Sequence, residues 1–235
     1  MFVKELEQAV LNGEAHLAVH SAKDLPAEMP EGLGLLGVSD RADARDVVIG
    51  EEAGLMALPA ATRVATGSPR RAAQIAEVRP DLDIIDIRGN VGTRLKKLEE
   101  GYAEAIVLAA AGLERLGLVD QPSVALPVDI CTPAPGQGYL ALQGRSDDME
   151  TRAIVERLTD PHDFTCLHVE RQVLAELGGG CLSAIGAHCE RHDIGFALTV
   201  YERPDGEREG TRVKVEGADA GTLASEAIAR LRADD

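Results

Sequence analysis

The sequence predicts an α/β fold followed by a small α+β unit at the C-terminal end. Through the middle of the chain, short apolar runs typical of strands alternate with amphipathic runs typical of helices. This alternation favours a parallel sheet covered by helices. Near the end, two strand-like runs are joined by a Pro-Asp-Gly turn and followed by a helical run, which indicates a separate α+β unit.

The first expected elements are a helix, a strand and a polar turn. Leu6, Val10 and Leu11 share one side of a helix over 3–11, and Gly13 ends it. A strand over 16–20 runs into the turn 21–26, which reads Ser-Ala-Lys-Asp-Leu-Pro. Because open α/β sheets place ligands where strands end, this turn is a candidate site, although an ordinary capped loop would show the same pattern.

The elements that follow are regular. Strands are expected over 63–66, 82–87 and 105–109, and helices over 70–78 and 93–100, with a short one ending at 116. Ser68 and Pro69 suit the N-cap and first turn of the helix over 70–78. Residues 121–138 are rich in proline and glycine and predict a hinge, after which a strand over 139–142 returns to the first unit. The remaining expectations are helices over 151–158, 163–177 and about 220–232, and strands over 194–201 and 211–216.

Arginines stand in the first turns of two predicted helices, where the helix dipole disfavours positive charge. They are Arg70 and Arg71 in one helix and Arg94 in the next, with Arg88 at a strand exit. Residues 66–97 hold seven Lys/Arg against four Asp/Glu, in a chain of net charge −16. The pattern favours a pocket for a polycarboxylate or phosphate, and pairing of surface arginines with nearby acids is the alternative.

Three glycines, at 178–180, lead directly to Cys181. Glycine allows backbone angles closed to other residues, so this stretch suits a pliable turn that presents a thiol for covalent chemistry. A helix C-cap followed by a small buried cysteine fits the same letters.

The composition limits the class of partner. A net charge of −16 argues against nucleic acid and anionic membranes. An acidic surface with five lysines suits a protein that works in high salt. Four irregularly spaced cysteines, no apolar run near 18 residues and no apolar signal core lead us to expect the reducing cytoplasm.

Three other chemistries remain open on the residues alone. A zinc site could use the cysteines and histidines at 166, 168, 181, 188, 189 and 192, but their spacing matches no zinc pattern well, and we expect no metal. A thiol protease or acyltransferase would need a histidine beside Cys181. A non-catalytic solute-binding or effector-sensing module for a polycarboxylate anion would use the arginines and the hinge but not Cys181.

Seven short motifs occur in order along nearly the whole chain: 2–7, 20–26, 66–71, 88–94, 111–116, 136–138 and 179–181. Together they resemble the porphobilinogen deaminase (hydroxymethylbilane synthase) family. The resemblance implies two lobes like those of periplasmic binding proteins and a small α+β C-terminal domain that carries the cofactor cysteine. The implied domains are 1–40 with 136–156, 41–135, and 157–235.

The resemblance also implies the activity. Cys181 would carry a dipyrromethane cofactor in thioether linkage, and four porphobilinogen units would be added with release of ammonia before water frees the linear tetrapyrrole hydroxymethylbilane. Asp24 would be the main catalytic group, because a carboxylate can stabilise positive charge that develops on a pyrrole. The implied cofactor-binding residues are Ser21, Lys23, Thr66, Ser68, Arg70, Arg71 and Arg94, and the implied substrate-binding residues are Arg88, Arg94 and Arg115. We expect a monomer with porphobilinogen as its small-molecule partner and no nucleic-acid or membrane partner.

The sequence departs from the family pattern at two places. Gly67 stands where many members have serine, so one hydroxyl contact is expected to be missing. The chain also begins at the Phe-Val-Lys-Glu motif, which members carry after a further N-terminal segment. We therefore expect the first lobe to be incomplete.

Overall fold

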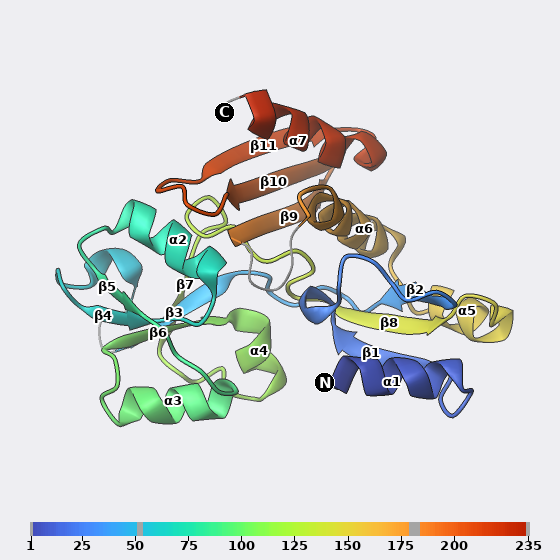
Figure 1. The fold of residues 1–235 in the computed structure, drawn as a ribbon, viewed down its shortest axis with the longest axis horizontal. Coiled ribbons are helices and arrows are strands. Elements are labelled where there is room, and N and C mark those ends of the chain that lie inside the picture. Colours follow the sequence, from blue (N-terminus) through green and yellow to red (C-terminus); the bar gives the residue numbers. More distant parts are fainter. Residues whose placement is uncertain (1, 51–53, 179–183, 234–235) are drawn as a thin grey trace.

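The computed structural model describes residues 2–50, 54–178 and 184–233, whose strands form three sheets (Figure 1). The first sheet has the order β1-β8-β2, and β8 runs antiparallel to both neighbours. Helices α1 and α5 pack on it. The elements are α1 (Phe2–Leu11), β1 (Leu17–Ser21), β2 (Leu33–Val38), β8 (Leu140–Arg145) and α5 (Met149–Glu156).

The second sheet is mixed and has the order β5-β4-β6-β3-β7. β5, β4 and β6 are parallel, as the strand–helix alternation predicted, but β3 and β7 are antiparallel to their neighbours. The prediction of a parallel sheet is therefore confirmed for the three strands it included. The sequence predicted neither β3 nor β7, and β3, which runs against both of its neighbours, makes the sheet mixed. The strands are β3 (Asp46–Gly50), β4 (Arg63–Ala65), β5 (Asp83–Ile85), β6 (Ala105–Ala109) and β7 (Ser123–Ala125).

Helices cover both faces of this mixed sheet (Figure 1). Ile75 of α2 (Pro69–Val78) packs with the β3 residue Val48 on one face. Leu95 of α3 (Val91–Glu99) and Leu113 of α4 (Ala110–Arg115) pack on the other. Burial on both faces explains why the apolar run of β3 lacks the alternation that marks a half-exposed strand.

The third sheet, β9-β10-β11, is antiparallel and packs against two helices. The sequence predicted the helices and two of these strands to within a few residues, but not the first strand. That strand is rich in small residues and its exposed half is polar, so it shows no clear apolar period. The elements are α6 (Pro161–Glu176), β9 (Ala184–His192), β10 (Gly195–Arg203), β11 (Thr211–Gly217) and α7 (Leu223–Ala233).

Other local predictions are confirmed in their main features. Ser68 accepts a hydrogen bond from the Arg71 backbone N–H at 3.5 Å and caps α2 with Pro69 in the first turn. The proline- and glycine-rich stretch 121–138 contains β7, so its first part is sheet and only its second part is a connection. Within the described ranges, no helix is long and apolar enough to cross a membrane.

The first and second sheets are joined by the segments 39–45 and 126–139, which pass closely beside each other. Gly138 has a φ of +96°, and a Cβ at this position would lie 2.5 Å from the Ala42 carbonyl oxygen. Gly136 has a φ of +78° and would meet the backbone of Ala22 and Lys23 at 3.1 Å. Glycine is therefore required at both positions, where the crossing segments meet the turn after β1.

A buried ion pair fastens this crossing to the third sheet. Arg41 donates to both carboxylate oxygens of Glu170, at 2.8 and 3.2 Å, and to the backbone oxygen of Gln137. Glu170 also accepts from the backbone N–H groups of Gly136 and Cys189, each at 2.7 Å. Its side chain is fully buried, so this carboxylate replaces its water shell with four donors.

The apolar cores group the sheets unequally. One continuous cluster joins Leu25 and Tyr139, near the first sheet, with Leu167 and Val173 of α6 and with the third sheet. The mixed sheet has separate clusters on its two faces. Among the described residues, a small cluster of Ala73, Ala184 and Tyr201 makes the apolar contact between α2 and the third sheet.

We predict that Glu170→Leu lowers the free energy of unfolding by about 3–5 kcal/mol, because it leaves the Arg41 guanidinium buried without a counter-charge. Adding Arg41→Met should recover part of this loss, since the double variant holds no unpaired charge. Urea unfolding of both variants measures the two values. A double variant less stable than the single one would contradict the assignment of this ion pair.

Candidate functional site

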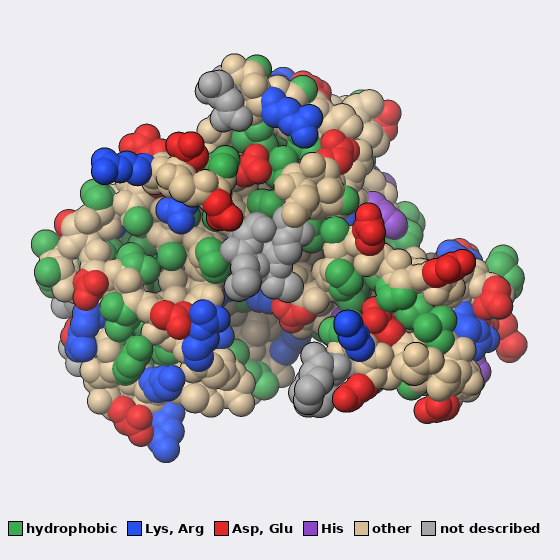
Figure 2. Space-filling view, in the orientation of Figure 1, with side chains coloured by type: hydrophobic (Ala, Val, Ile, Leu, Met, Phe, Trp, Pro, Cys, Tyr) green, Lys and Arg blue, Asp and Glu red, His purple; other side chains and the backbone are tan. Residues whose placement is uncertain are grey.

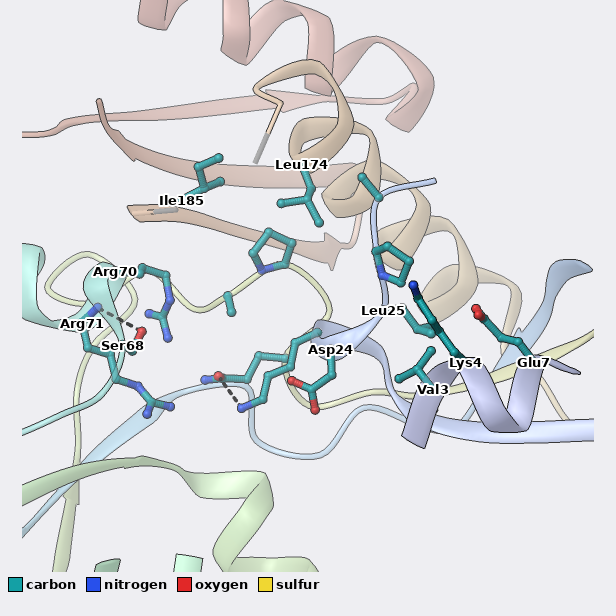
Figure 3. A pocket seen from close by; sticks show the side chains of 16 residues that line it. Val3, Lys4, Glu7, Asp24, Leu25, Ser68, Arg70, Arg71, Leu174 and Ile185 are labelled. Carbon is teal, nitrogen blue, oxygen red and sulfur yellow. Dashed lines mark hydrogen bonds between the residues drawn. The ribbon is translucent and has the colours of Figure 1, made fainter. Parts of the chain in front are cut away.

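A cavity of about 520 Å³ lies where the three sheets meet (Figure 3). Its walls come from α1, the turn after β1, the start of α2, the crossing segment, α6 and β9. Five of the predicted site residues line it, namely Lys23, Asp24, Ser68, Arg70 and Arg71. The other lining residues are Val3, Lys4, Glu7, Leu25, Pro26, Ala27, Ala134, Pro135, Gln137, Leu174 and Ile185.

Lys23 and Asp24 enter the cavity from a 3₁₀ turn, Ala22–Asp24, that directly follows β1. Burial and the positive charge of Arg71 lower the pKa of Lys23 from 10.5 to about 8, against the opposing effects of Asp46 and Asp24. The Asp24 side chain is exposed, and its charge is one of those that raise the pKa of Lys23. The turn thus places in one cavity the carboxylate of Asp24 and the amine of Lys23, which loses its charge near pH 8.

Arg70 and Arg71 converge on a buried carboxylate, that of Asp46 at the start of β3. Arg70 Nη1 donates to Asp46 Oδ2 at 2.8 Å, and Arg71 Nη2 donates to Asp46 Oδ1 at 2.6 Å. Burial by itself would raise the pKa of Asp46, but the two arginines hold that pKa well below its usual value. The first-turn arginines therefore have a buried counter-ion. They are not the surface arginines paired with neighbouring acids of the alternative, since both are buried and Asp46 is 24 and 25 positions away.

This pairing does not use all of the arginine donors. Arg70 bonds Asp46, Thr132 and Cys131 through Nη1 alone. Its Nε and Nη2 have no hydrogen-bond partner among the residues described, although the side chain lines the cavity. Two arginines and one lysine around a single Asp46 carboxylate leave an excess of positive charge, so the residues present fit a polycarboxylate ligand.

Gln137 connects Asp46 with the turn after β1. Its Nε2 donates to Asp46 Oδ1 at 2.8 Å and to the Ala44 carbonyl oxygen at 2.6 Å. Its Oε1 accepts from Lys23 Nζ at 3.3 Å. One buried amide thereby fixes Lys23 relative to the carboxylate that holds both arginines.

The remaining predicted residues that the structure describes do not line the cavity. Ser21 ends β1, and Thr66 is buried and accepts from the Ser68 backbone N–H at 3.3 Å. Arg88 is exposed and pairs with Asp86 at 2.8 Å, and Arg115 donates to the Gly138 carbonyl oxygen at 2.7 Å. Arg94 is half-buried, and burial together with the charges of Arg71 and Arg88 lowers its pKa. The charges of Arg71, Arg88 and Arg94 therefore lie near one another and extend the basic region beyond the cavity.

The sequence also raised two questions of cysteine chemistry, the role of Cys181 and the alternative of a zinc site. Cys181 lies outside the described residues. Among those described, no group of three or more His, Cys, Asp or Glu side chains is arranged to hold a metal ion.

Figure 2 shows basic and acidic side chains interspersed over the lobe that carries α3.

Sequence reasoning missed Asp46, and it gave Gln137 no role. Asp46 opens the apolar run of β3, and an acidic residue at the entrance of a buried strand is a usable signal because such a charge needs a partner. Gln137 stood only as the middle of a Gly-Gln-Gly motif, and nothing local indicated that its side chain would contact Lys23 and Asp46.

We predict that Lys23 becomes reactive toward acetic anhydride with a midpoint near pH 8, because its pKa is lowered to about 8. Lys214 is an internal control, since its hydrogen bond with Glu216 raises its pKa. Peptide mass spectrometry after labelling at about pH 6 to 11 measures both midpoints. Coincident midpoints would contradict the lowered pKa of Lys23.

Replacing Asp46 with asparagine should lower the pKa of Lys23 still further, because the Asp46 carboxylate is one of the charges that raise it. The same change should reduce the free energy of unfolding by about 3–5 kcal/mol, since two buried arginines lose their carboxylate. The labelling series and urea unfolding measure the two effects. Asp81→Asn, which removes the exposed partner of Arg79, is the matched control and should leave the Lys23 midpoint unchanged.

Some solved structures show weak similarity to this fold. The periplasmic VFT2 domain of BvgS from Bordetella pertussis aligns with a TM-score of 0.39 and 19% identity, covering 66% of each chain. The periplasmic aliphatic sulphonate binding protein SsuA from Escherichia coli aligns with a TM-score of 0.43 and 13% identity, covering 74% of this chain and 57% of SsuA.

Comparisons of sequence are much stronger. Residues 1–153 match the family model described as porphobilinogen deaminase, dipyromethane cofactor binding domain. The chain is 46% identical over 201 residues to porphobilinogen deaminase of Geobacter sulfurreducens, covering 86% of this chain and 63% of the relative. It is also 46% identical over 188 residues to porphobilinogen deaminase of Chlorobaculum parvum, covering 80% of this chain and 60% of the relative. The chain thus spans somewhat less than two thirds of the length of these relatives, and it belongs to the porphobilinogen deaminase family.

Proposed function

We propose that this chain takes part in the polymerisation of porphobilinogen to the linear tetrapyrrole hydroxymethylbilane, as a hydroxymethylbilane synthase. The observation that carries this function is the convergence of Lys23, Asp24, Arg70 and Arg71 on one cavity in a chain of this family. The names of the relatives support an enzyme over a non-catalytic solute-binding module. In this proposal the lobes formed by the first and second sheets act like those of periplasmic binding proteins. The proposed domains are 1–40 with 136–156, 41–135, and 157–235.

Substrate recognition rests on charge. Porphobilinogen carries an acetate and a propionate group, and the unpartnered Nε and Nη2 of Arg70 can donate to a carboxylate within the cavity. Lys23 adds a positive charge below about pH 8 and loses it as the pH rises through that value. Anion affinity is therefore expected to fall above this pH. In this proposal the arginines at 88, 94 and 115 bind the substrate. Arg94 also binds the cofactor, together with Ser21, Thr66 and Ser68.

Asp24 is the proposed catalytic group. The aminomethyl carbon of porphobilinogen loses its amino group as ammonia and bonds to a free carbon of the acceptor pyrrole, while positive charge develops on the pyrroles. The acceptor carbon then loses its hydrogen as a proton, which balances the proton that departs with ammonia. A carboxylate that accepts a hydrogen bond from the pyrrole N–H stabilises this charge where it develops. The described residues offer the Asp24 carboxylate no hydrogen-bond partner, so its oxygens are available to the substrate.

The cofactor assigned to this family fits the basic cavity, and Lys23, Ser68, Arg70 and Arg71 would hold its carboxylates. When bound, dipyrromethane supplies the pyrrole carbon to which the first substrate unit is joined. We propose Cys181 as its point of attachment through a thioether bond. The monomeric state and the adaptation to high salt stay predictions.

The test combines intact mass with product formation on the expressed chain incubated with porphobilinogen. Asp24→Asn should retain the added mass of dipyrromethane but form product about 10²–10³-fold more slowly, since it loses a charge that acts in the transition state. Cys181→Ser should lack the added mass. Glu28→Gln removes an exposed carboxylate of the same loop and is the matched control, expected to behave like the unmodified chain. A wild-type chain that neither gains mass nor makes porphyrin-fluorescent product would overturn the proposed function.

A further inference from the structure

Arg171, on α6, is bound to the loop that follows Asp24. Its Nη2 donates to the carbonyl oxygens of Pro26 and Ala27, at 2.8 and 2.9 Å. Neither contact is local, since the partners are separated by 145 and 144 positions in the chain. Arg171 thus joins the C-terminal unit directly to the turn that presents Asp24.

The position of Asp24 depends on its backbone. The described residues give its carboxylate no hydrogen bond, so no side-chain hydrogen bond among them fixes it in place. Two backbone bonds hold the turn itself: Ala22 N–H donates to Tyr139 O at 3.1 Å and Leu25 N–H donates to Ala22 O at 3.3 Å. The residues after the turn form no helix or strand before β2. A side chain that hydrogen-bonds to this loop therefore limits how far the Asp24 carboxylate can move.

Apolar packing places the same loop on α6. Leu25 is 2% exposed and belongs to the cluster that contains Leu167, Val169 and Val173 of α6. Pro26 and Ala27 line the cavity together with Leu174, which lies one turn beyond Arg171 on α6 (Figure 3). The loop and α6 form one wall of the cavity, and Arg171 supplies the polar contact in that wall.

Arg171 is an unusual residue for a purely structural contact. Its Nη1 is buried and has no hydrogen-bond partner among the residues described, and it has no carboxylate partner there either. Burial lowers its pKa. A partly buried guanidinium that leaves one buried donor unmatched is a costly way to fill space, because an apolar side chain of similar size would need no partner.

We propose that Arg171 is a positioning residue, which holds the loop after Asp24 against α6 and so fixes the Asp24 carboxylate in the cavity. The catalytic part of this inference rests on the proposed function, whereas the contact itself does not. The placement of Asp24 then depends on Arg171 of the C-terminal unit, although Asp24 follows a strand of the first sheet.

The test compares Arg171→Met and Arg171→Lys with a matched control in the full chain. Arg230→Met is that control, because Arg230 is a helical arginine that also donates to a carbonyl oxygen, that of Lys214, and lies outside the cavity lining. Amide hydrogen exchange followed by NMR reports on Leu25 N–H, and amides of β6 report on global opening. Steady-state kinetics with porphobilinogen report on Asp24.

Arg171→Met should speed exchange at Leu25 by about tenfold and leave the β6 amides unchanged, since only the loop is released. It should lower kcat about tenfold with KM changed by less than about twofold, and Arg171→Lys should restore part of both values, because one ammonium group can still reach a carbonyl oxygen. Arg230→Met should change neither.

Unchanged exchange at Leu25 would overturn the inference, as would equal acceleration at β6 or an equal effect of Arg230→Met. Faster exchange at Leu25 with an unaltered kcat would also overturn it, since the contact would then be structural only. A wild-type chain that makes no product, in which Leu25 still responds to Arg171→Met but not to Arg230→Met, would remove the proposed function and retain the contact that fixes the loop.

Discussion

The buried carboxylate of Asp46 is the constraint on which the rest of the site depends. A carboxylate without water needs strong donors, and Asp46 obtains them from Arg70, Arg71 and Gln137. These three partners come from the start of α2 and from the crossing segment, so one charge fixes the relative places of a strand, a helix and a connection. Because two arginines meet one carboxylate, the basic character of the cavity is reduced but not removed.

A second buried carboxylate, Glu170, organises the opposite side of the crossing. Arg41 bonds Glu170 and the backbone oxygen of Gln137, while the Gln137 side chain bonds Asp46 and Lys23. Gln137 is therefore shared by the two buried acid sites and by the turn that carries Asp24. This polar junction allows a charged cavity to lie beside three sheets whose own cores are apolar.

The distribution of apolar contacts places the two halves of the site on different bodies. Asp24 belongs to a turn that shares one continuous core with α6 and the third sheet. The arginines of α2 belong to the mixed sheet, which has its own cores. Polar contacts join α2 to the third sheet, among them Tyr201 to Glu77 at 2.6 Å and Arg212 to Gln74 at 2.8 Å. Asp24 and the arginines of α2 are thus held together chiefly by the crossing segments and by hydrogen bonds.

The sequence alone determined the helices and most strands, because capping residues and apolar periods act between residues that are close in the chain. Ser68 before Pro69 marks the start of α2, and the glycines at 136 and 138 mark the end of the predicted hinge. Family motifs also brought Lys23, Asp24, Arg70 and Arg71 into one predicted site. Only the tertiary structure decided the antiparallel places of β3 and β7, the partner of the first-turn arginines and the contact of Arg171 with the Asp24 loop. Those contacts join residues that are 24 to 145 positions apart, and a buried charge selects its partner by proximity in space, which no local pattern records.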